Sequence, residues 1–157
     1  MKELTLLFLR RNDEVLLAMK KRGFGEGRWN GVGGKLEEGE SLEEALLRES
    51  QEEIGVTPVV YTQVADITFD QFYKSEPAHM HVHAFIAHEW NGVPEESEEM
   101  KPQWFAIDTL PYENMWADDP FWLPLVLEGK KIRANFTLDV SDTITSHSIE
   151  EVSGFEA

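Results

Sequence analysis

Three glutamates in one stretch of the sequence have the spacing of a divalent-cation site. Glu49, Glu52 and Glu53 fall within residues 41–54, whose apolar residues follow a helical period. At about 100° per residue, Glu49 and Glu53 project within roughly 20° of Leu42, on the stripe where core residues are expected. Such like charges repel each other, and the helix dipole disfavours anions near a C-terminus. Because a solvated acidic face would lie opposite the apolar stripe, the pattern favours a bound cation.

The residues around these glutamates suit a magnesium ion that also contacts phosphate. Mg²⁺ takes oxygen ligands, and beside phosphates it is typically held by one or two carboxylates plus substrate oxygens. Arg48 lies four residues before Glu52 and can pair with it along the helix. Glycines at 31, 33 and 34 allow the preceding loop to approach a metal or a phosphate closely. Together these features predict metal-assisted chemistry on a phosphate chain.

Strands are the main elements that must position this helix. Ser41 is a good N-cap, Glu44 completes a capping box and Gly55 can end the helix. Alternating and β-branched residues predict strands at residues 4–10, 14–20, 56–72, 79–90, 103–107, 132–138 and 144–152, with a second helix at 118–128. A turn is expected at 12–13, a loop with room for a short strand at 23–34, and a loop at 73–78. Hairpin-like connections dominate, which predicts an α+β fold with a mixed sheet and helices on its faces.

Composition and charge exclude several classes of function. The chain of 157 residues has no cysteine, which excludes disulfides, thiolate zinc sites and cysteine nucleophiles. We expect residues 1–157 to form a single domain. The net charge of −16 repels nucleic acids and anionic membranes, so neither is an expected partner. No stretch approaches the roughly 20 apolar residues of a membrane helix, and the apolar run at 4–9 is too short for a secretion signal. We expect a cytoplasmic monomer.

From Gly34 onward, the residues GKLEEGESLEEALLRESQEEIGV resemble the Nudix box. That pattern is Gly, five residues, Glu, seven residues, then Arg-Glu, two residues, Glu-Glu, one residue, Gly and an apolar residue. The matching positions here are Gly34, Glu40, Arg48, Glu49, Glu52, Glu53, Gly55 and Val56. Ser50 departs from the pattern, because the family usually has an apolar residue there. Since Ser50 is not a ligand position, we expect altered packing and intact chemistry.

The resemblance implies an α/β/α sandwich, with the mixed β-sheet between helices, and attack of water on a nucleoside diphosphate linked to another group. The implied cofactor is Mg²⁺, with Mn²⁺ as a substitute, which lowers the pKa of bound water and neutralises phosphate charge. Arg48 would orient a carboxylate, and the general base is left open between Glu53 and Glu99. The implied metal ligands are Gly33 through its carbonyl, Glu49, Glu52, Glu53 and Glu99.

Further segments, at residues 19–35, 98–105 and 115–124, resemble the MutT-homologue branch of this family. That branch hydrolyses oxidised purine nucleoside triphosphates to the monophosphate and pyrophosphate, which sanitises the nucleotide pool. Asn30, Asp118 and Asp119 would then read the purine edge, and Phe69 and Trp116 would flank the base. The complete set of implied substrate residues is Thr5, Lys20, Asn30, Val32, Gly33, Gly34, Lys35, Phe69, Trp116, Ala117, Asp118 and Asp119.

Several of these residues have a simpler structural interpretation. Asp119 precedes Pro120, so its role could be purely structural, as the N-cap of a helix with proline at the first helical position. If the adjacent acids Asp118 and Asp119 are buried, however, each raises the pKa of the other, and a protonated and an ionised carboxyl together could read an oxidised purine. His79, His81 and His83 share one strand face, but no further nitrogen ligand is evident, so we interpret them as a surface patch. The segment 71–78 is expected to be a long loop that could influence substrate choice.

Two other functions remain open on the sequence alone. A Nudix hydrolase could act on another nucleotide, such as a methylated purine triphosphate, a nucleoside diphosphate sugar or a dinucleoside polyphosphate. A non-catalytic Nudix module could instead bind nucleotides or a protein. The intact cluster of Glu49, Glu52 and Glu53 argues against the second alternative, because a binding module has no need for such mutually repulsive charges.

Overall fold

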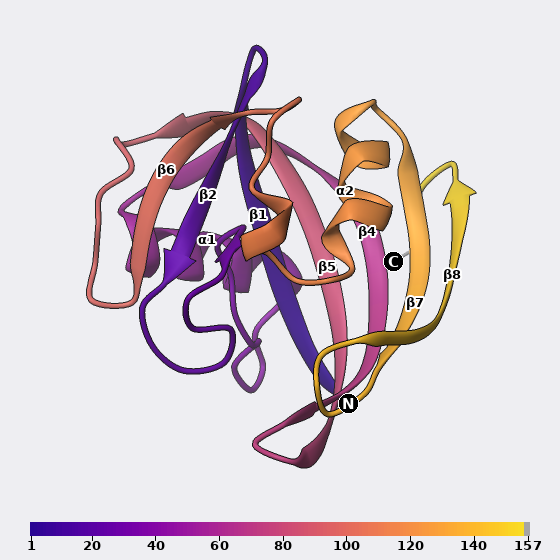
Figure 1. Cartoon of the computed structure of the whole chain (residues 1–157). Helices are drawn as coiled ribbons and strands as arrows, with labels where there is room; N and C mark the ends of the chain where they lie inside the picture. The colour runs from indigo at the N-terminus through magenta and orange to yellow at the C-terminus, as the bar shows by residue number, and fades with distance from the viewer. Residues whose placement is uncertain (156–157) are drawn as a thin grey trace.

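An eight-stranded mixed sheet forms the centre of the molecule in the computed structural model, which describes residues 1–155 (Figure 1). The strand order is β3-β2-β1-β5-β4-β7-β8, and β6 also pairs with β2. The β1–β5 and β4–β7 pairs are parallel, and the other pairs are antiparallel. The strands are β1 (Lys2–Arg11), β2 (Glu14–Lys20), β3 (Trp29–Asn30), β4 (Thr57–Tyr73), β5 (Glu76–Asn91), β6 (Met100–Ala106), β7 (Lys131–Leu138) and β8 (Ile144–Val152).

Two α-helices cover opposite faces of this sheet. Helix α1 (Leu42–Ile54) packs Leu46 with Leu7 of β1 in one apolar cluster. Helix α2 (Asp119–Leu127) packs Trp122 with Phe8 in the other cluster. Successive residues of a strand point to opposite faces, so Leu7 and Phe8 place the two helices on different sides of the sheet. This arrangement confirms the predicted α+β sandwich. A short 3₁₀ helix, η1 (Tyr112–Asn114), precedes α2.

Helix α1 begins and ends where the local sequence predicts. The Ser41 hydroxyl accepts a hydrogen bond from the backbone N–H of Glu44 at 3.1 Å, and the Glu44 carboxylate accepts one from the Ser41 N–H at 2.9 Å. Gly55 ends the helix with φ of 72°, a left-handed conformation that glycine adopts without steric cost. The helix therefore has a fixed register, which sets the direction of its glutamates.

The prediction of a loop between the two longest strands is wrong. Residues 73–78 belong instead to a β-hairpin in which β4 and β5 pair from Thr57↔Asn91 to Tyr73↔Glu76. The turn consists of Lys74 and Ser75, with φ of 51° and 65°. Glycine and asparagine are the usual residues at such left-handed positions, so the local sequence carried no sign of a tight turn. The segment expected to be an irregular loop is thus an extension of the sheet (Figure 1).

The other predicted elements are present within one to three residues of their expected bounds. None of the helices formed by residues 1–155 is long and apolar enough to cross a membrane.

Candidate active site

Of the three clustered glutamates Glu49, Glu52 and Glu53, helix α1 directs two towards the protein interior. Glu53 is 2% exposed, and the Glu49 side chain is 16% exposed. Glu52, one residue before Glu53, is 60% exposed at its side chain. The carboxylates of Glu49 and Glu53 therefore replace core residues on the inner stripe of the helix, as its periodicity predicts.

Arg48 holds several carboxylates around the start of this stripe. Its Nε lies 2.7 Å from Oε2 of Glu40, and its second guanidinium nitrogen Nη2 lies 2.9 Å from Oε1 of the same residue. The other nitrogen, Nη1, contacts Glu49 at 3.0 Å and Glu52 at 3.3 Å. The Arg48 guanidinium, with a further hydrogen bond from the Glu37 N–H, lowers the pKa of Glu40 to about 2. Sequence analysis predicted the Arg48–Glu52 pair, but the two-point pair with Glu40 is the stronger geometry.

Glu53 has an environment that disfavours its charge in the absence of a cation. Burial and the neighbouring Glu49 charge raise the pKa of Glu53 to about 8, against the opposing effects of Lys20 and the Gly33 amide. The Gly33 N–H donates to Oε1 of Glu53 at 3.0 Å, while Oε2 is buried without a hydrogen-bond partner among residues 1–155. A buried carboxylate oxygen without a partner is energetically costly, which indicates that another group binds it.

The glycine-rich loop approaches both α1 and β1 too closely for any side chain. A Cβ atom on Gly33 would lie 1.9 Å from the carbonyl oxygen of Thr5. A Cβ atom on Gly34 would lie 2.6 Å from Oε1 of Glu49. Glycine at these positions thus leaves the space around the Glu49 carboxylate open.

An acidic cavity of about 380 Å³ collects the predicted metal-binding side chains. Glu99 reaches it from the segment before β6 and lies 3.5 Å from a guanidinium nitrogen of Arg22. The Arg22 guanidinium is the one positive group in the wall of this cavity among the described residues. The lining residues are Arg22, Glu49, Glu52, Glu53, Ser97, Glu98 and Glu99. Oxygen ligands from two elements therefore converge, as a hard divalent cation requires.

A second cavity, of about 340 Å³, has aromatic walls and the size of a small-molecule pocket. Trp116 stacks on Phe24 with ring centroids 4.9 Å apart, and the Arg28 guanidinium lies 4.1 Å from the Trp116 ring centroid. Tyr73, at the tip of β4, meets Phe24 edge-on at 5.0 Å. Phe69 forms another part of the wall. Flat, apolar surfaces of this kind suit a planar heterocycle.

Two adjacent carboxyl groups lie buried in the wall of the aromatic cavity. Asp118 is 3% exposed and Asp119 is 2% exposed. The Trp122 indole Nε1 donates to Oδ2 of Asp118 at 2.8 Å, whereas Oδ2 of Asp119 has no partner among the described residues. Burial raises the pKa of Asp118 to about 6, and burial together with the Asp118 charge raises the pKa of Asp119 well above its ordinary value. Neither side chain caps α2, so the simpler interpretation of this pair is wrong.

Most residues in the implied substrate set line this aromatic cavity. Val32 and Ala117 do not: Val32 is buried in the apolar cluster beneath α1, and Ala117 is exposed. The lining members are Thr5, Lys20, Asn30, Gly33, Gly34, Lys35, Phe69, Trp116, Asp118 and Asp119.

Sequence reasoning missed several residues of the aromatic cavity. Gln71 is 6% exposed, and its amide Nε2 lies 3.3 Å from the sulfur of Met80, a weak acceptor. Gln71 lies two residues after Phe69 on β4, so it shares a face with Phe69. This relationship could have identified it if residues 71–78 had been recognised as strand. The cavity-lining residues that were missed include Leu4, Phe24, Arg28, Gln71, Tyr73 and Met80.

Comparison with known proteins places this geometry in a family. The NUDIX domain family matches residues 3–126. The oxidized purine nucleoside triphosphate hydrolase of Mus musculus is 46% identical over 151 residues, which cover 96% of each chain. The protein of the same name from Danio rerio is 45% identical over 151 residues, with the same coverage. The crystal structure of the mutator MutT protein from Bacillus halodurans superposes with a TM-score of 0.84 at 26% identity, covering 96% of this chain and 98% of that one. The chain is therefore a member of the Nudix hydrolase family.

Proposed function

We propose that this protein hydrolyses oxidised purine nucleoside triphosphates, of the 8-oxo-dGTP and 2-hydroxy-dATP type, to the monophosphate and pyrophosphate. Removing such nucleotides would keep them out of DNA. The observation that carries the proposal is the buried pair Asp118 and Asp119 in the wall of an aromatic cavity. The names and high identity of the mouse and zebrafish relatives support the same substrate class.

The carboxyl pair supplies both a donor and an acceptor for a purine edge. Burial and the Asp118 charge raise the pKa of Asp119, which favours its protonated form, and a protonated carboxyl can donate a hydrogen bond. Asp118 accepts a hydrogen bond from the Trp122 indole and has a pKa of about 6, so its ionised form can accept another from the base. Oxidation of a purine changes the order of donors and acceptors along its edges. A pocket with two neighbouring carboxyls in different protonation states can distinguish these orders.

Asn30 adds a third polar contact in the same cavity. Its Oδ1 accepts a hydrogen bond from the Gly31 N–H at 2.8 Å, and its Nδ2 amide, which has no hydrogen-bond partner within the part of the chain that the structure describes, can donate to a base. Trp116, braced by Phe24 and Arg28, provides a flat surface for one face of the base. Phe69, stacked on Phe136 at 5.7 Å, provides another apolar wall. We therefore assign base recognition to this cavity.

The acidic cavity fits the divalent cation that Nudix hydrolases use. The unpartnered Oε2 of Glu53, the proximity of Glu49 and the space left by Gly34 all suit a cation with oxygen ligands. We propose Mg²⁺, held by Glu49, Glu52, Glu53 and the Gly33 carbonyl, with Glu99 as a further ligand and Mn²⁺ as a substitute. When bound, the cation supplies charge neutralisation for the phosphates and a water of lowered pKa.

The protein's own residues position the reacting groups between the two cavities. Arg48 fixes the carboxylate of Glu49 through a 3.0 Å contact, and the Gly33 amide fixes that of Glu53. Lys20 and Lys35 line the aromatic cavity and can contact the phosphates, which offsets the repulsion from the acidic cluster. Glu53 and Glu99 are both within the acidic cavity, so either can take the proton of the attacking water.

A substrate panel tests the proposal. Pyrophosphate release would be measured with Mg²⁺ and 8-oxo-dGTP, 2-hydroxy-dATP, dGTP, a methylated purine triphosphate, a nucleoside diphosphate sugar and a dinucleoside polyphosphate. We expect release from an oxidised triphosphate well above release from dGTP, with the monophosphate as second product. Hydrolysis confined to the methylated nucleotide, the sugar or the dinucleotide would overturn the substrate assignment. Binding without any release would overturn catalysis. A cytoplasmic location and a monomeric state remain predictions.

A further inference from the structure

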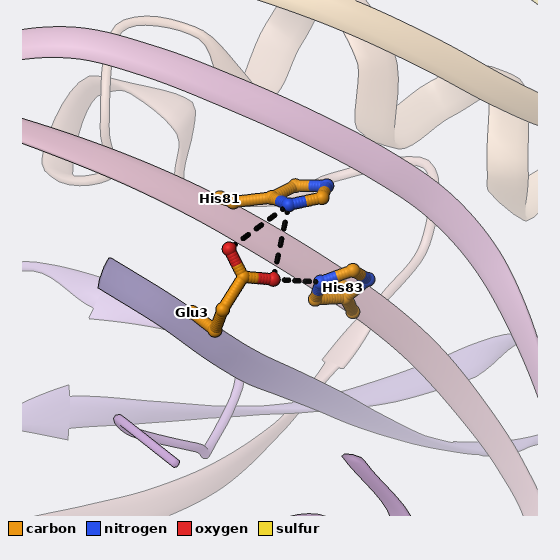
Figure 2. Close-up of side chains that lie close together, drawn as sticks. All are labelled: Glu3, His81 and His83. Carbon is orange, nitrogen blue, oxygen red and sulfur yellow. Dashed lines mark hydrogen bonds and ion pairs between the residues drawn. The ribbon is translucent and has the colours of Figure 1, made fainter. Parts of the chain in front are cut away.

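Three potential metal ligands from two neighbouring strands converge on one face of the sheet. Figure 2 shows the Glu3 carboxylate of β1 between the imidazoles of His81 and His83 of β5. Oε1 of Glu3 lies 3.0 Å from Nδ1 of His81 and 2.9 Å from Nε2 of His83. The three ligand atoms all lie within 4.8 Å of one another. The Glu3 carboxylate, near the N-terminus, therefore supplies a third potential ligand beside the two histidines.

The sheet register holds this triad, defined as Glu3, His81 and His83, on a rigid frame. In the parallel β1–β5 pair, Glu3 is aligned with His81 and Thr5 is aligned with His83. Residues two apart in a strand share a face, so the two imidazoles must lie side by side. Their ring centroids are 4.1 Å apart. Ligands on paired strands keep their spacing better than ligands on loops.

The triad is separate from the aromatic and acidic cavities. Met80 and Val82, which alternate with the two histidines along β5, line the aromatic cavity. The histidines therefore project from the opposite face of the sheet, the face that α1 packs against. No member of the triad lines either cavity. A ligand held here would not occupy the proposed catalytic centre.

Outer contacts orient the imidazoles as they do in metal sites. Oδ1 of Asp66, on β4, lies 2.6 Å from Nε2 of His81, so the opposite nitrogen Nδ1 is turned towards Glu3. A carboxylate on the far nitrogen of a histidine fixes its tautomer and increases its basicity as a ligand. The Gln63 amide nitrogen lies 3.4 Å from Nδ1 of His83 and contacts the second ring on the side away from Glu3. The Asp66 contact thus presets the His81 nitrogen that is aimed at the Glu3 carboxylate.

We propose that Glu3, His81 and His83 form a binding site for a divalent transition-metal ion of the Zn²⁺ class. Two imidazole nitrogens and one carboxylate oxygen suit Zn²⁺, whereas Mg²⁺ prefers oxygen ligands alone. His83 is 8% exposed, so this ligand is already removed from solvent. Three protein ligands leave a fourth position for water.

Metal bound at the triad would join the first strand to β5. Glu3 and His81 are 78 positions apart in sequence, so the ion would cross-link distant parts of the chain. A ligand that binds only the folded state stabilises it by mass action. Zinc should therefore raise the melting temperature of the protein without taking part in nucleotide hydrolysis.

Calorimetric titration of the full chain with Zn²⁺, in excess Mg²⁺ to fill the acidic cavity, tests this site. We expect one zinc per chain and a higher melting temperature. His81→Ala, His83→Ala and Glu3→Gln should each remove this binding, and Asp66→Asn should weaken it about 10- to 100-fold. Glu3 is 42% exposed at its side chain, so Glu3→Gln tests the site without disturbing the core. Circular dichroism would confirm that each variant is folded.

Two controls separate this site from other zinc binding. His88→Ala changes an exposed histidine of the same strand and should leave the titration unchanged. Glu53→Gln should also leave it unchanged, because that residue belongs to the acidic cavity. If the parent binds no more zinc than His81→Ala and His83→Ala do, the triad is a hydrogen-bonded cluster only and the proposal is overturned. Loss of the same binding in Glu53→Gln would overturn it as well, since the zinc would then lie in the acidic cavity.

Discussion

The backbone amide of Gly33 donates a 3.0 Å hydrogen bond to Oε1 of Glu53, across 20 positions of the sequence. This contact joins the glycine-rich loop to the end of α1. It fixes one oxygen of the carboxylate and leaves the other, Oε2, buried without a partner among the described residues. The loop and the helix therefore form one unit around the acidic cavity, and changes to either should affect metal binding.

Replacement of Glu53 with Gln should reduce kcat by about 10²- to 10⁴-fold, since it removes a metal ligand and a candidate base. The fold should persist, because Gln removes a buried like charge beside Glu49 and can still accept from the Gly33 N–H. Steady-state pyrophosphate release over a range of Mg²⁺ concentrations measures the effect, with Glu128→Gln, an exposed residue, as the control. An unchanged kcat at saturating Mg²⁺ would remove Glu53 from the catalytic centre.

A single methyl group on Gly34 should weaken the metal site. Its Cβ would lie 2.6 Å from Oε1 of Glu49, so the carboxylate must move. We expect Gly34→Ala to require several-fold more Mg²⁺ for half-maximal activity. Gly154→Ala is the matched control, because a Cβ atom there meets nothing within 4 Å. Equal Mg²⁺ requirements in the two variants would show that Glu49 adapts without loss.

Asp118→Asn and Asp119→Asn should each lower kcat/KM for 8-oxo-dGTP by about 10- to 100-fold, the usual worth of a hydrogen bond to a charged or buried group. The Mg²⁺ requirement should stay the same, because the pair lines the aromatic cavity and not the acidic one. Kinetics with 8-oxo-dGTP and dGTP, at several Mg²⁺ concentrations, separate the two effects. Unchanged kcat/KM in both variants would refute the assignment of base recognition to this pair.

The same carboxyl pair should make the stability of the metal-free protein depend on pH. The pKa of Asp118 is raised from 3.8 to about 6, and that of Asp119 is raised well above its ordinary value. Between the unfolded and folded pKa values the folded protein binds more protons, so its free energy of unfolding falls as pH rises. Asp119→Asn removes part of this loss. Between about pH 4 and pH 6, the interval that the ordinary and folded pKa values of Asp118 span, urea unfolding should show a smaller loss of stability for the variant than for the parent. Parallel curves for parent and variant would contradict the raised pKa.

Gln71 offers a test of substrate choice. Its buried amide lines the aromatic cavity, and the Met80 sulfur is its one hydrogen-bond partner among the side chains of residues 1–155. We expect Gln71→Leu to change the ratio of kcat/KM for 8-oxo-dGTP and 2-hydroxy-dATP by about 10-fold, the effect of one hydrogen bond of roughly 1.4 kcal/mol. Gln103→Leu, an exposed change on β6, should leave the ratio unaltered. If Gln71→Leu also leaves it unaltered, the amide does not contact the base.

Local sequence features were sufficient to predict the parts of the site that lie on α1. Ser41, Glu44 and Gly55 define the ends of the helix through contacts a few residues apart, and its periodicity then sets the direction of Glu49 and Glu53. These interactions depend on neighbouring residues alone, which is why sequence reasoning reaches them.

Contacts between distant segments were beyond such reasoning. Phe24, Tyr73 and Trp116 meet only because the fold brings a loop, a hairpin tip and the segment before α2 together. Glu3 joins His81 only through the parallel pairing of β1 with β5. The hairpin itself was missed because Lys74 and Ser75 adopt a left-handed conformation without the usual glycine or asparagine.

A crystal structure with Mn²⁺ and a non-hydrolysable analogue of 8-oxo-dGTP tests the claim that Glu49 and Glu53 hold the metal beside the phosphates, because anomalous scattering locates the metal. We predict metal peaks within coordination distance of Glu49 and Glu53, phosphate oxygens completing the coordination, and the base against Asp118 and Asp119. Metal bound elsewhere, with both glutamates free of it and of the phosphates, would contradict the claim.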